Sequence, residues 1–285
     1  MLGMNIMDIP GIIGLIDLTR LNTKDPSEEE VTQISVLCKN AKTAVGPVAA
    51  VCVYPEYVAQ AKEQLKDSSI RIATVVNFPT GNEPLDPTLA AITKSIAEGA
   101  DEIDVVLPYE ALKKGDTEFV IEYLKKCREA TGDRTLKVII ESGVLNTEEI
   151  IAATTIVADI GADFVKTSTG KVPNKGATLE AVEAMLTVLK TRQEAGKKSI
   201  ALKISGGITG DNVENYLELI EKYMGPEWLT SENVRIGASA LLKDLLTKIP
   251  STAPQMTFPQ NNIPWSELAM GGEEEASPDS APAAY

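Results

Sequence analysis

Short apolar runs alternate along this chain with longer segments in which apolar residues recur every three or four positions. The short runs predict buried strands, and the longer periodic segments predict amphipathic helices. We predict eight strands, at residues 14–18, 48–54, 70–78, 102–107, 136–141, 164–168, 200–205 and 234–238. The helices are predicted at residues 27–44, 55–65, 87–98, 117–130, 146–160, 179–195, 210–223 and 238–248.

Helix start signals precede several of these segments. Ser27 and Glu30 have the spacing of a capping box, and Asn146 precedes two glutamates at the positive end of a helix dipole. Pro55 and Pro87 suit a first helical turn, where a missing N–H leaves no bond unmade.

The alternation of strands and helices indicates a parallel α/β fold. Eight such units in about 250 residues predict a (β/α)8 TIM barrel. A doubly wound open sheet is the alternative. No glycine-rich dinucleotide loop follows the first predicted strand, which weakens that alternative.

The barrel domain is expected to span residues 1–249, because the composition changes after Lys248. Four prolines interrupt residues 250–264, and residues 271–284 are small, acidic and proline-bearing. We predict a flexible, disordered tail over residues 250–285. It ends in Tyr285, which is either incidental or a group that folds back over the barrel mouth.

Composition narrows the possible functions. The formal charge of −14 and the pI near 4.6 argue against binding to nucleic acid or to an anionic membrane surface. The chain has no histidine, which excludes imidazole-based hydrolase triads and most zinc sites. Cys38, Cys52 and Cys127 have no metal-ligand spacing, and neither a signal peptide nor a membrane-spanning run is evident. We therefore expect a cytoplasmic protein without a bound metal.

A lysine interrupts the apolar strand at residues 164–168. An unpaired buried charge costs several kcal/mol, so Lys166 must be paired, reach solvent, or be held neutral for chemistry. Position alone does not separate a strand-end lysine from a reactive one.

Two further residues favour the interpretation of Lys166 as a reactive lysine. Lys203 also lies in an apolar strand that ends in glycines, and Asp104 follows a Gly-Ala-Asp sequence at the same distance as Lys166 follows another. If the strands are equivalent members of one barrel, Asp104 and Lys166 point inward at the same level.

Neighbouring strands lie about 4.8 Å apart, which would bring Lys166 close to Lys203. Their repulsion would lower one lysine pKa and leave a neutral amine that can form a Schiff base with an aldehyde or ketone. Asp104 would accept and return protons or bond the second lysine. A purely structural Asp–Lys–Lys ion network is the alternative interpretation.

The loops after the last three predicted strands favour an anion site. They carry glycines that expose backbone N–H groups, a cation and a hydroxyl, and barrels often bind phosphate at such loops. The candidate residues are Gly170, Lys171, Gly206, Gly207, Gly237 and Ser239.

These motifs resemble those of deoxyribose-phosphate aldolases, which are class I, Schiff-base-forming barrel enzymes. The resemblance runs from about Gly14 to Lys248. It is carried by Asp17-Leu-Thr-Arg-Leu-Asn, Val51-Cys-Val-Tyr-Pro, Val76-Asn-Phe-Pro-Thr-Gly, Gly99-Ala-Asp-Glu-Ile-Asp-Val-Val, Lys137-Val-Ile-Ile-Glu and the segment from Gly161 to Lys171.

The resemblance implies reversible cleavage of 2-deoxy-D-ribose 5-phosphate to acetaldehyde and D-glyceraldehyde 3-phosphate. Lys166 matches the Schiff-base lysine, Lys203 the lysine that perturbs it, and Asp104 the carboxylate of the proton relay. Tyr285 matches a terminal tyrosine that acts in proton transfer. The resemblance implies no metal or organic cofactor, and relatives are often dimers. It adds Asp17, Thr19, Cys52 and Thr169 to the expected substrate-binding residues.

The chain departs from the family pattern at two positions. Thr209 stands where many members carry an arginine, and Ala240 replaces a serine. Both changes remove contacts to phosphate, which suggests relaxed use of unphosphorylated acceptors. Cys52 either reaches the substrate mouth, where it would add to unsaturated aldehydes, or is a small buried hydrophobe.

Two other functions compete with this interpretation. Another Schiff-base lyase of the same barrel would act on a keto-acid or ketose phosphate, and a pyruvate donor would need an arginine near the strand ends. A non-catalytic barrel would instead bind sugar phosphates as a sensor. It would form no Schiff base, so borohydride would fix no aldehyde on the protein.

Overall fold

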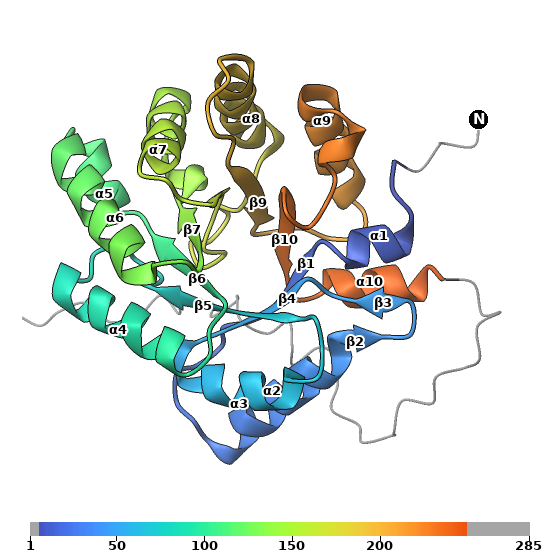
Figure 1. The fold of residues 1–285 in the computed structure, drawn as a ribbon. Coiled ribbons are helices and arrows are strands. Elements are labelled where there is room, and N and C mark those ends of the chain that lie inside the picture. The colour runs from blue at the N-terminus through green and yellow to red at the C-terminus, as the bar shows by residue number, and fades with distance from the viewer. Residues whose placement is uncertain (1–5, 250–285) are drawn as a thin grey trace, which may run out of the picture.

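The computed structural model describes residues 6–249, so the predicted tail at residues 250–285 and Tyr285 lie outside the described residues. Eight parallel strands close into a barrel in which each strand pairs with its neighbours in chain order, and the first strand pairs with the last (Figure 1). The barrel strands are β1 (Ile16–Arg20), β4 (Ala50–Val53), β5 (Arg71–Val76), β6 (Glu102–Val106), β7 (Thr135–Ile139), β8 (Phe164–Lys166), β9 (Ala201–Ser205) and β10 (Val234–Ala238).

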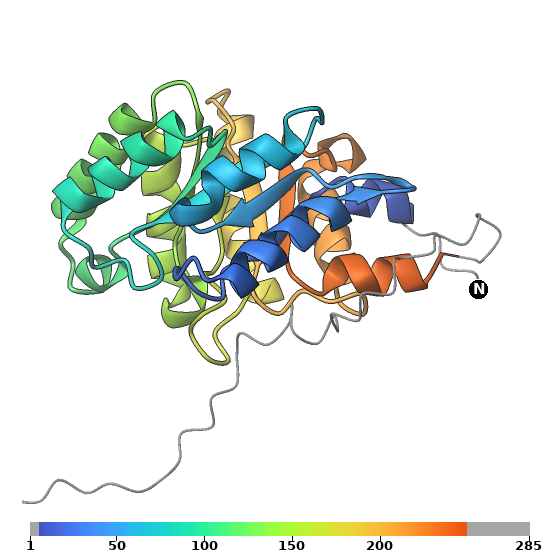
Figure 2. The same cartoon turned by 90° about the horizontal axis from the view of Figure 1, so that it is seen from below.

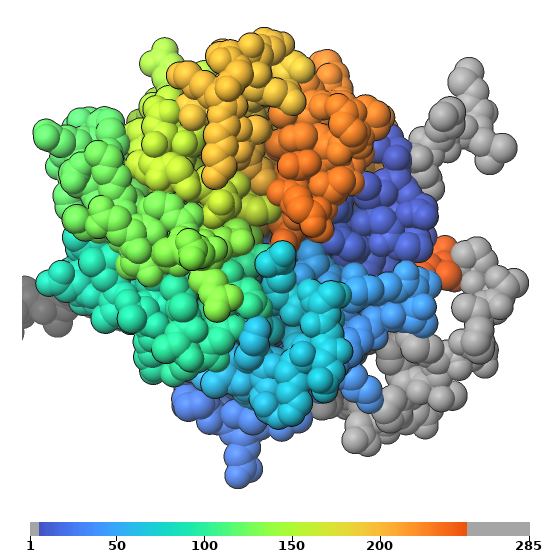
Figure 3. Space-filling model, viewed as in Figure 1, coloured from blue at the N-terminus to red at the C-terminus, as the bar shows by residue number. Residues whose placement is uncertain are grey.

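Helices surround the barrel and connect its strands, as the two perpendicular views show (Figures 1 and 2). In the space-filling view, consecutive segments meet around the centre of the molecule (Figure 3). Apolar residues on the inner helix faces, such as Ile34, Leu37 and Val58, are buried against the strands. The helices are α1 (Ile9–Ile13), α2 (Glu28–Asn40), α3 (Val58–Leu65), α4 (Leu85–Ala97), α5 (Tyr109–Lys113), α6 (Thr117–Thr131), α7 (Thr147–Asp159), α8 (Leu179–Glu194), α9 (Val213–Met224) and α10 (Leu241–Thr247).

The predicted TIM barrel is confirmed, with shifted boundaries. The first strand begins at Ile16 rather than at residue 14 and continues to Arg20. The helix predicted at residues 27–44 ends at Asn40, and its last residues instead form β2 (Lys42–Thr43), which pairs antiparallel with β3 (Gly46–Pro47). The five-residue helices α1 and α5 were not predicted, because they are too short for a helical period to appear.

The start signals are confirmed in part. Asn146 forms a complete capping box at α7. Ser27 accepts a hydrogen bond from the Glu30 backbone N–H, but the Glu30 carboxylate binds the Arg20 guanidinium at 2.7 and 2.9 Å instead of closing the box. α4 begins at Leu85, two residues before the predicted proline, which still lies in the first turn.

The repeated Gly-Ala-Asp sequence has a structural role at the start of two barrel strands. Asp101 precedes β6 and accepts the backbone N–H of Ile72 in the neighbouring strand at 3.0 Å. Asp163 precedes β8 and accepts the N–H of Leu136 at 2.9 Å. Each aspartate thereby fixes its strand against the preceding neighbour, which gives both strands the same inward-facing positions.

No helix in the described range, residues 6–249, has both the length and the apolar composition needed to cross a membrane.

Candidate active site

Lys166 is the last residue of β8, and its side chain points into the barrel with only 3% of its surface exposed. Its Nζ lies 2.9 Å from Asp104 Oδ2. In the strand register, Asp104 pairs with Lys137, and Lys137 pairs with Phe164. Lys166 therefore lies two residues beyond the position on β8 that is in register with Asp104. Because barrel strands are tilted, this offset brings the two side chains to one level, as predicted.

Asp104 is the centre of the site. Its Oδ1 accepts from Lys137 at 2.9 Å, and its Oδ2 accepts from Lys166 at 2.9 Å and from Lys203 at 2.8 Å. Burial acts to raise the pKa of the Asp104 carboxyl, but the three lysines outweigh it and hold this pKa well below its usual value. Asp104 is therefore ionised and aligns the Lys166 amine.

The ion network extends beyond the three predicted residues. Lys203 contacts Asp17 at 2.5 Å, and Arg235 contacts both Asp17 at 2.7 Å and Glu102 at 2.9 Å. Lys137 joins the two parts, because it hydrogen-bonds Glu102 as well as Asp104. Glu102, Lys137 and Arg235 were not predicted, although each interrupts an apolar strand as Lys203 does.

Asp17, which was predicted to bind substrate, lies behind the cavity wall. Asp17 is fully buried and forms ion pairs with Lys203 and Arg235, and it does not line the cavity described below. Its place in the network explains its residue type without a substrate contact.

The groups that form direct ion pairs in this network do not balance in charge if each of them is ionised. Three carboxylates, Asp17, Glu102 and Asp104, are in contact with four cations. Arg71 also approaches Glu102 at 3.6 Å, but 54% of its side chain is exposed, so water screens its charge. A net buried charge is costly, and the network becomes neutral when one lysine loses its proton.

Lys166 is the lysine whose environment favours deprotonation. Burial lowers the pKa of Lys166, Asp104 opposes this effect, and Lys203 adds to it. Burial also acts on Lys203, but Asp104 and Asp17 outweigh it and raise the pKa of Lys203. The predicted repulsion between the two lysines therefore contributes, but burial is the larger cause. A neutral Lys166 beside a protonated Lys203 provides a nucleophile and a proton donor.

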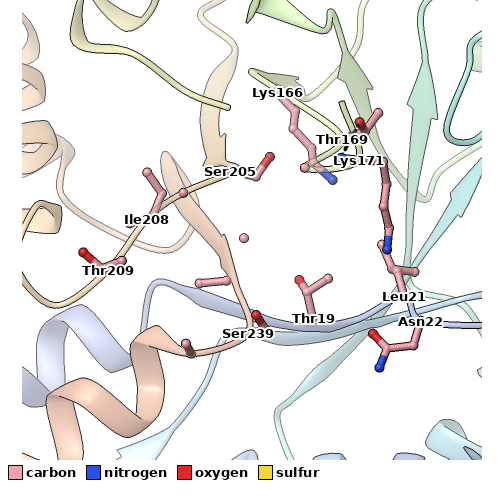
Figure 4. Close-up of a pocket in the computed structure, with 16 residues that line it drawn as sticks. Thr19, Leu21, Asn22, Lys166, Thr169, Lys171, Ser205, Ile208, Thr209 and Ser239 are labelled. Atoms are coloured by element: carbon pink, nitrogen blue, oxygen red, sulfur yellow. Dashed lines mark hydrogen bonds between the residues drawn. The ribbon is translucent and has the colours of Figure 1, made fainter. Parts of the chain in front are cut away.

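A cavity of about 340 Å³ opens at the Lys166 amine (Figure 4). The loops after β1, β8, β9 and β10 form its walls, at the carboxyl ends of the strands, where barrel active sites lie. Lys166, Thr169 and Lys171 lie on one side and Thr209 on the other. Among the predicted residues, those that line the cavity are Thr19, Lys166, Thr169, Gly170, Lys171, Gly206, Gly207, Gly237 and Ser239.

Gly206 allows the loops around the cavity to pack closely. Its φ of +90° is unfavourable for other residues, and a Cβ at this position would lie 2.9 Å from the Gly176 Cα. The Gly206 carbonyl accepts the Ala177 N–H at 3.0 Å, which joins the loops after β8 and β9. Backbone N–H groups can thus approach a ligand from both loops.

Of the two alternatives for Cys52, the structure favours the buried one. Cys52 lies on β4, is fully buried and does not line the cavity, in agreement with the alternative of a small buried hydrophobe. Burial raises the pKa of its thiol, so the thiolate that would attack an unsaturated aldehyde is disfavoured.

We expect the folded protein to react slowly with a thiol reagent. All three cysteines are buried, and burial raises the pKa of Cys38 to about 11 and that of Cys127 to about 12. A thiol-reactive chromophore at pH 7.5 should label none of them within minutes, whereas denaturant should expose all three. Rapid labelling of native Cys52, mapped by peptide digestion, would contradict this placement.

Comparison with known proteins agrees with the geometry. Residues 12–246 match the model of the DeoC/LacD family aldolases. The chain belongs to this family. As a family member it is an aldolase, a carbon–carbon lyase, and the family resemblance read from its motifs is confirmed.

Several solved structures of aldolases have the same barrel fold. A protein from Coccidioides immitis assigned as a deoxyribose-phosphate aldolase is 31% identical, with a TM-score of 0.69 over 85% of this chain and 87% of the other. QR15, an aldolase, is 30% identical, with a TM-score of 0.68 over 83% of this chain and 95% of its own. The deoxyribose phosphate aldolase of Aeropyrum pernix, a tetramer in its own structure, shares the fold at 24% identity and a TM-score of 0.64, over 84% and 91% of the two chains.

Proposed function

We propose that this aldolase reversibly cleaves 2-deoxy-D-ribose 5-phosphate to acetaldehyde and D-glyceraldehyde 3-phosphate through a Schiff base on Lys166. The observation that carries the proposal is the buried Lys166 amine, whose pKa is lowered and which bonds Asp104 where the cavity begins. Family membership and the deoxyribose-phosphate aldolases among its structural relatives support the choice of substrate.

The proposed reaction begins when neutral Lys166 attacks the sugar aldehyde, and loss of water gives a protonated Schiff base. A base removes the proton of the C3 hydroxyl, the C2–C3 bond breaks, and its electrons move to the iminium to form an enamine. Glyceraldehyde 3-phosphate leaves. Protonation of the enamine carbon and hydrolysis then release acetaldehyde and restore the amine. The iminium accepts the electrons, so the proposal implies no metal or organic cofactor.

Asp104 and Lys203 suit the proton and charge changes of these steps. Asp104 lies 2.9 Å from the amine, so its carboxylate stabilises the iminium cation. Lys203 shares Asp104 Oδ2 with Lys166. It can protonate the hydroxyl that leaves as water when the Schiff base forms. Tyr285, proposed to transfer a proton at the enamine carbon, lies outside the described residues.

The cavity walls favour an acetaldehyde donor over a keto acid. No arginine lines the cavity within residues 6–249, and Arg20, at the end of β1, is paired with Glu30. A pyruvate-type donor would need an arginine to bind its carboxylate, and the other cation of the cavity, Lys171, is assigned to the phosphate. The phosphate is proposed to bind farther from Lys166, at Gly206, Gly207, Ser239 and Lys171.

We expect the enzyme to cleave 2-deoxyribose 5-phosphate, with a weaker preference for the phosphate than a site with an arginine would have. Thr209 and Ala240 both line the cavity, so their short side chains remove two polar contacts at the proposed phosphate end. The measurement is acetaldehyde release from 2-deoxyribose with and without its phosphate, compared as kcat/KM. Restoring the arginine with Thr209→Arg should raise kcat/KM for the phosphate ester about tenfold. No cleavage of either sugar would contradict the proposed function, and no effect of the arginine would contradict the placement of the phosphate.

The proposed role belongs to deoxyribonucleotide catabolism and carbohydrate degradation, in the cytoplasm, with small-molecule aldehydes and sugar phosphates as the partners. Assembly as a homodimer remains a prediction from the resemblance.

A further inference from the structure

Glu141 follows β7 and has an unusual backbone conformation. Its φ and ψ are both 54°, in the left-handed region that glycine and asparagine adopt more readily than glutamate. The residue is also fully buried. A buried glutamate held in a strained conformation, at the barrel end that carries the active site, suggests that its carboxylate has a function.

The Glu141 carboxylate binds one residue of the cavity wall. Its Oε2 accepts the Thr169 hydroxyl at 2.5 Å and the Thr169 N–H at 3.2 Å. Thr169 lines the cavity beside Lys166, and its Oγ1 also accepts the Lys171 N–H at 3.1 Å. Burial raises the pKa of Glu141, and both bonds from Thr169 oppose the rise, so they favour the carboxylate form that accepts them.

These contacts determine how Thr169 can bond a substrate. A hydroxyl has one proton and two lone pairs. The proton is directed to Glu141, and one lone pair is occupied by the Lys171 N–H. One lone pair remains for the cavity. Thr169 can therefore accept a hydrogen bond from a ligand hydroxyl but cannot donate one.

We propose that Glu141 is a positioning residue that fixes Thr169 as a hydrogen-bond acceptor, so that the site selects acceptor aldehydes with a hydroxyl on the carbon next to the carbonyl. The inference rests on the proposed function, because the reacting carbonyl carbon must lie at the enamine on Lys166. Thr169 is three residues from Lys166 and lines the same side of the cavity. A hydroxyl on the carbon bonded to the reacting carbon would then face this wall.

The test uses two acceptors of nearly equal size. Acetaldehyde serves as the donor at saturating concentration, and the acceptor is either glycolaldehyde or propanal, in which a methyl group replaces the hydroxyl. Glu141→Asn tolerates the left-handed backbone but is one methylene too short to reach Thr169. We expect Glu141→Asn to lower kcat/KM for glycolaldehyde about tenfold, mainly through KM, and to change the value for propanal less than twofold. Glu141→Gln, which keeps the length and one acceptor oxygen, should recover part of the loss.

Thr169→Val provides the matched control, because it removes the hydroxyl at the same volume. It should lose the preference for glycolaldehyde to the same extent, and adding Glu141→Asn to it should cause no further loss. Additive effects of the two changes, or equal losses with both acceptors, would overturn the inference.

Trapping with acetaldehyde and borohydride separates this inference from the proposed function. An adduct on Lys166 in the unmodified enzyme and in Glu141→Asn leaves the acceptor measurements to decide the role of Glu141. No adduct in the unmodified enzyme overturns the proposed function, and with it this inference.

Discussion

Replacing Lys166 with alanine should lower the rate of aldol cleavage by about 10⁴-fold or more, because no other amine on the cavity wall has the same contacts. Lys166 is the only lysine among the cavity-lining residues of the described chain that bonds Asp104. The measurement is intact mass after incubation with acetaldehyde and borohydride, followed by peptide mapping. The unmodified enzyme should gain one ethyl group on Lys166, and the variant should gain none at this site.

Lys171→Ala is the matched control for this experiment. Lys171 also lines the cavity, and burial lowers its pKa as it does that of Lys166. It lies on the loop after β8, whereas Lys166 is within the strand and next to Asp104. The control should therefore keep the adduct on Lys166, although it should bind the phosphate ester less well. An ethyl group that persists in Lys166→Ala and disappears in Lys171→Ala would identify Lys171 as the nucleophile and contradict our assignment.

The sequence predicted the fold and the centre of this site because the same pattern reveals both. Strands buried on both faces are almost wholly apolar, so a charged residue within one is conspicuous. Lys166, Lys203 and Asp104 were recognised in this way. The equal spacing of Asp104 and Lys166 from their preceding glycines predicted that both point inward at one level, and the structure adds their direct contact at 2.9 Å.

The rest of the network depends on which inward-facing side chains meet after the barrel closes. Glu102 lies on β6 and Arg235 on β10, so their bond at 2.9 Å crosses the interior and leaves no periodic signal in the sequence. Asp17 was assigned to substrate from the family resemblance alone, and only the structure shows its ion pairs with Lys203 and Arg235. Glu141 was missed because a single left-handed residue has no sequence pattern unless it is glycine or asparagine.

The charge balance of the barrel interior leads to opposite expectations for two substitutions. Lys203→Met removes a cation that lowers the pKa of Lys166 and leaves three carboxylates facing three cations, so Lys166 should keep its proton. Asp104→Asn removes the carboxylate that opposes this lowering, so the pKa of Lys166 should fall further. Because protonated Lys166 is unreactive, activity rises as pH increases through its pKa. The acid limb of the rate profile should therefore move to higher pH in Lys203→Met and to lower pH in Asp104→Asn.

Both substitutions should also reduce the rate of the reaction, for different reasons. At neutral pH we expect kcat to fall about a hundredfold or more in each, because Lys203→Met loses a proton donor and Asp104→Asn loses the group that aligns the amine and stabilises the iminium. The measurement is kcat/KM for 2-deoxyribose 5-phosphate from pH 5 to pH 10, with thermal unfolding to confirm that each variant is folded. The direction of the acid limb, which a general loss of structure would not move in opposite senses, is the decisive result. A shift in the same direction in both variants, or no shift in either, would contradict the assignment of Lys203 and Asp104 as charges that set the protonation of Lys166.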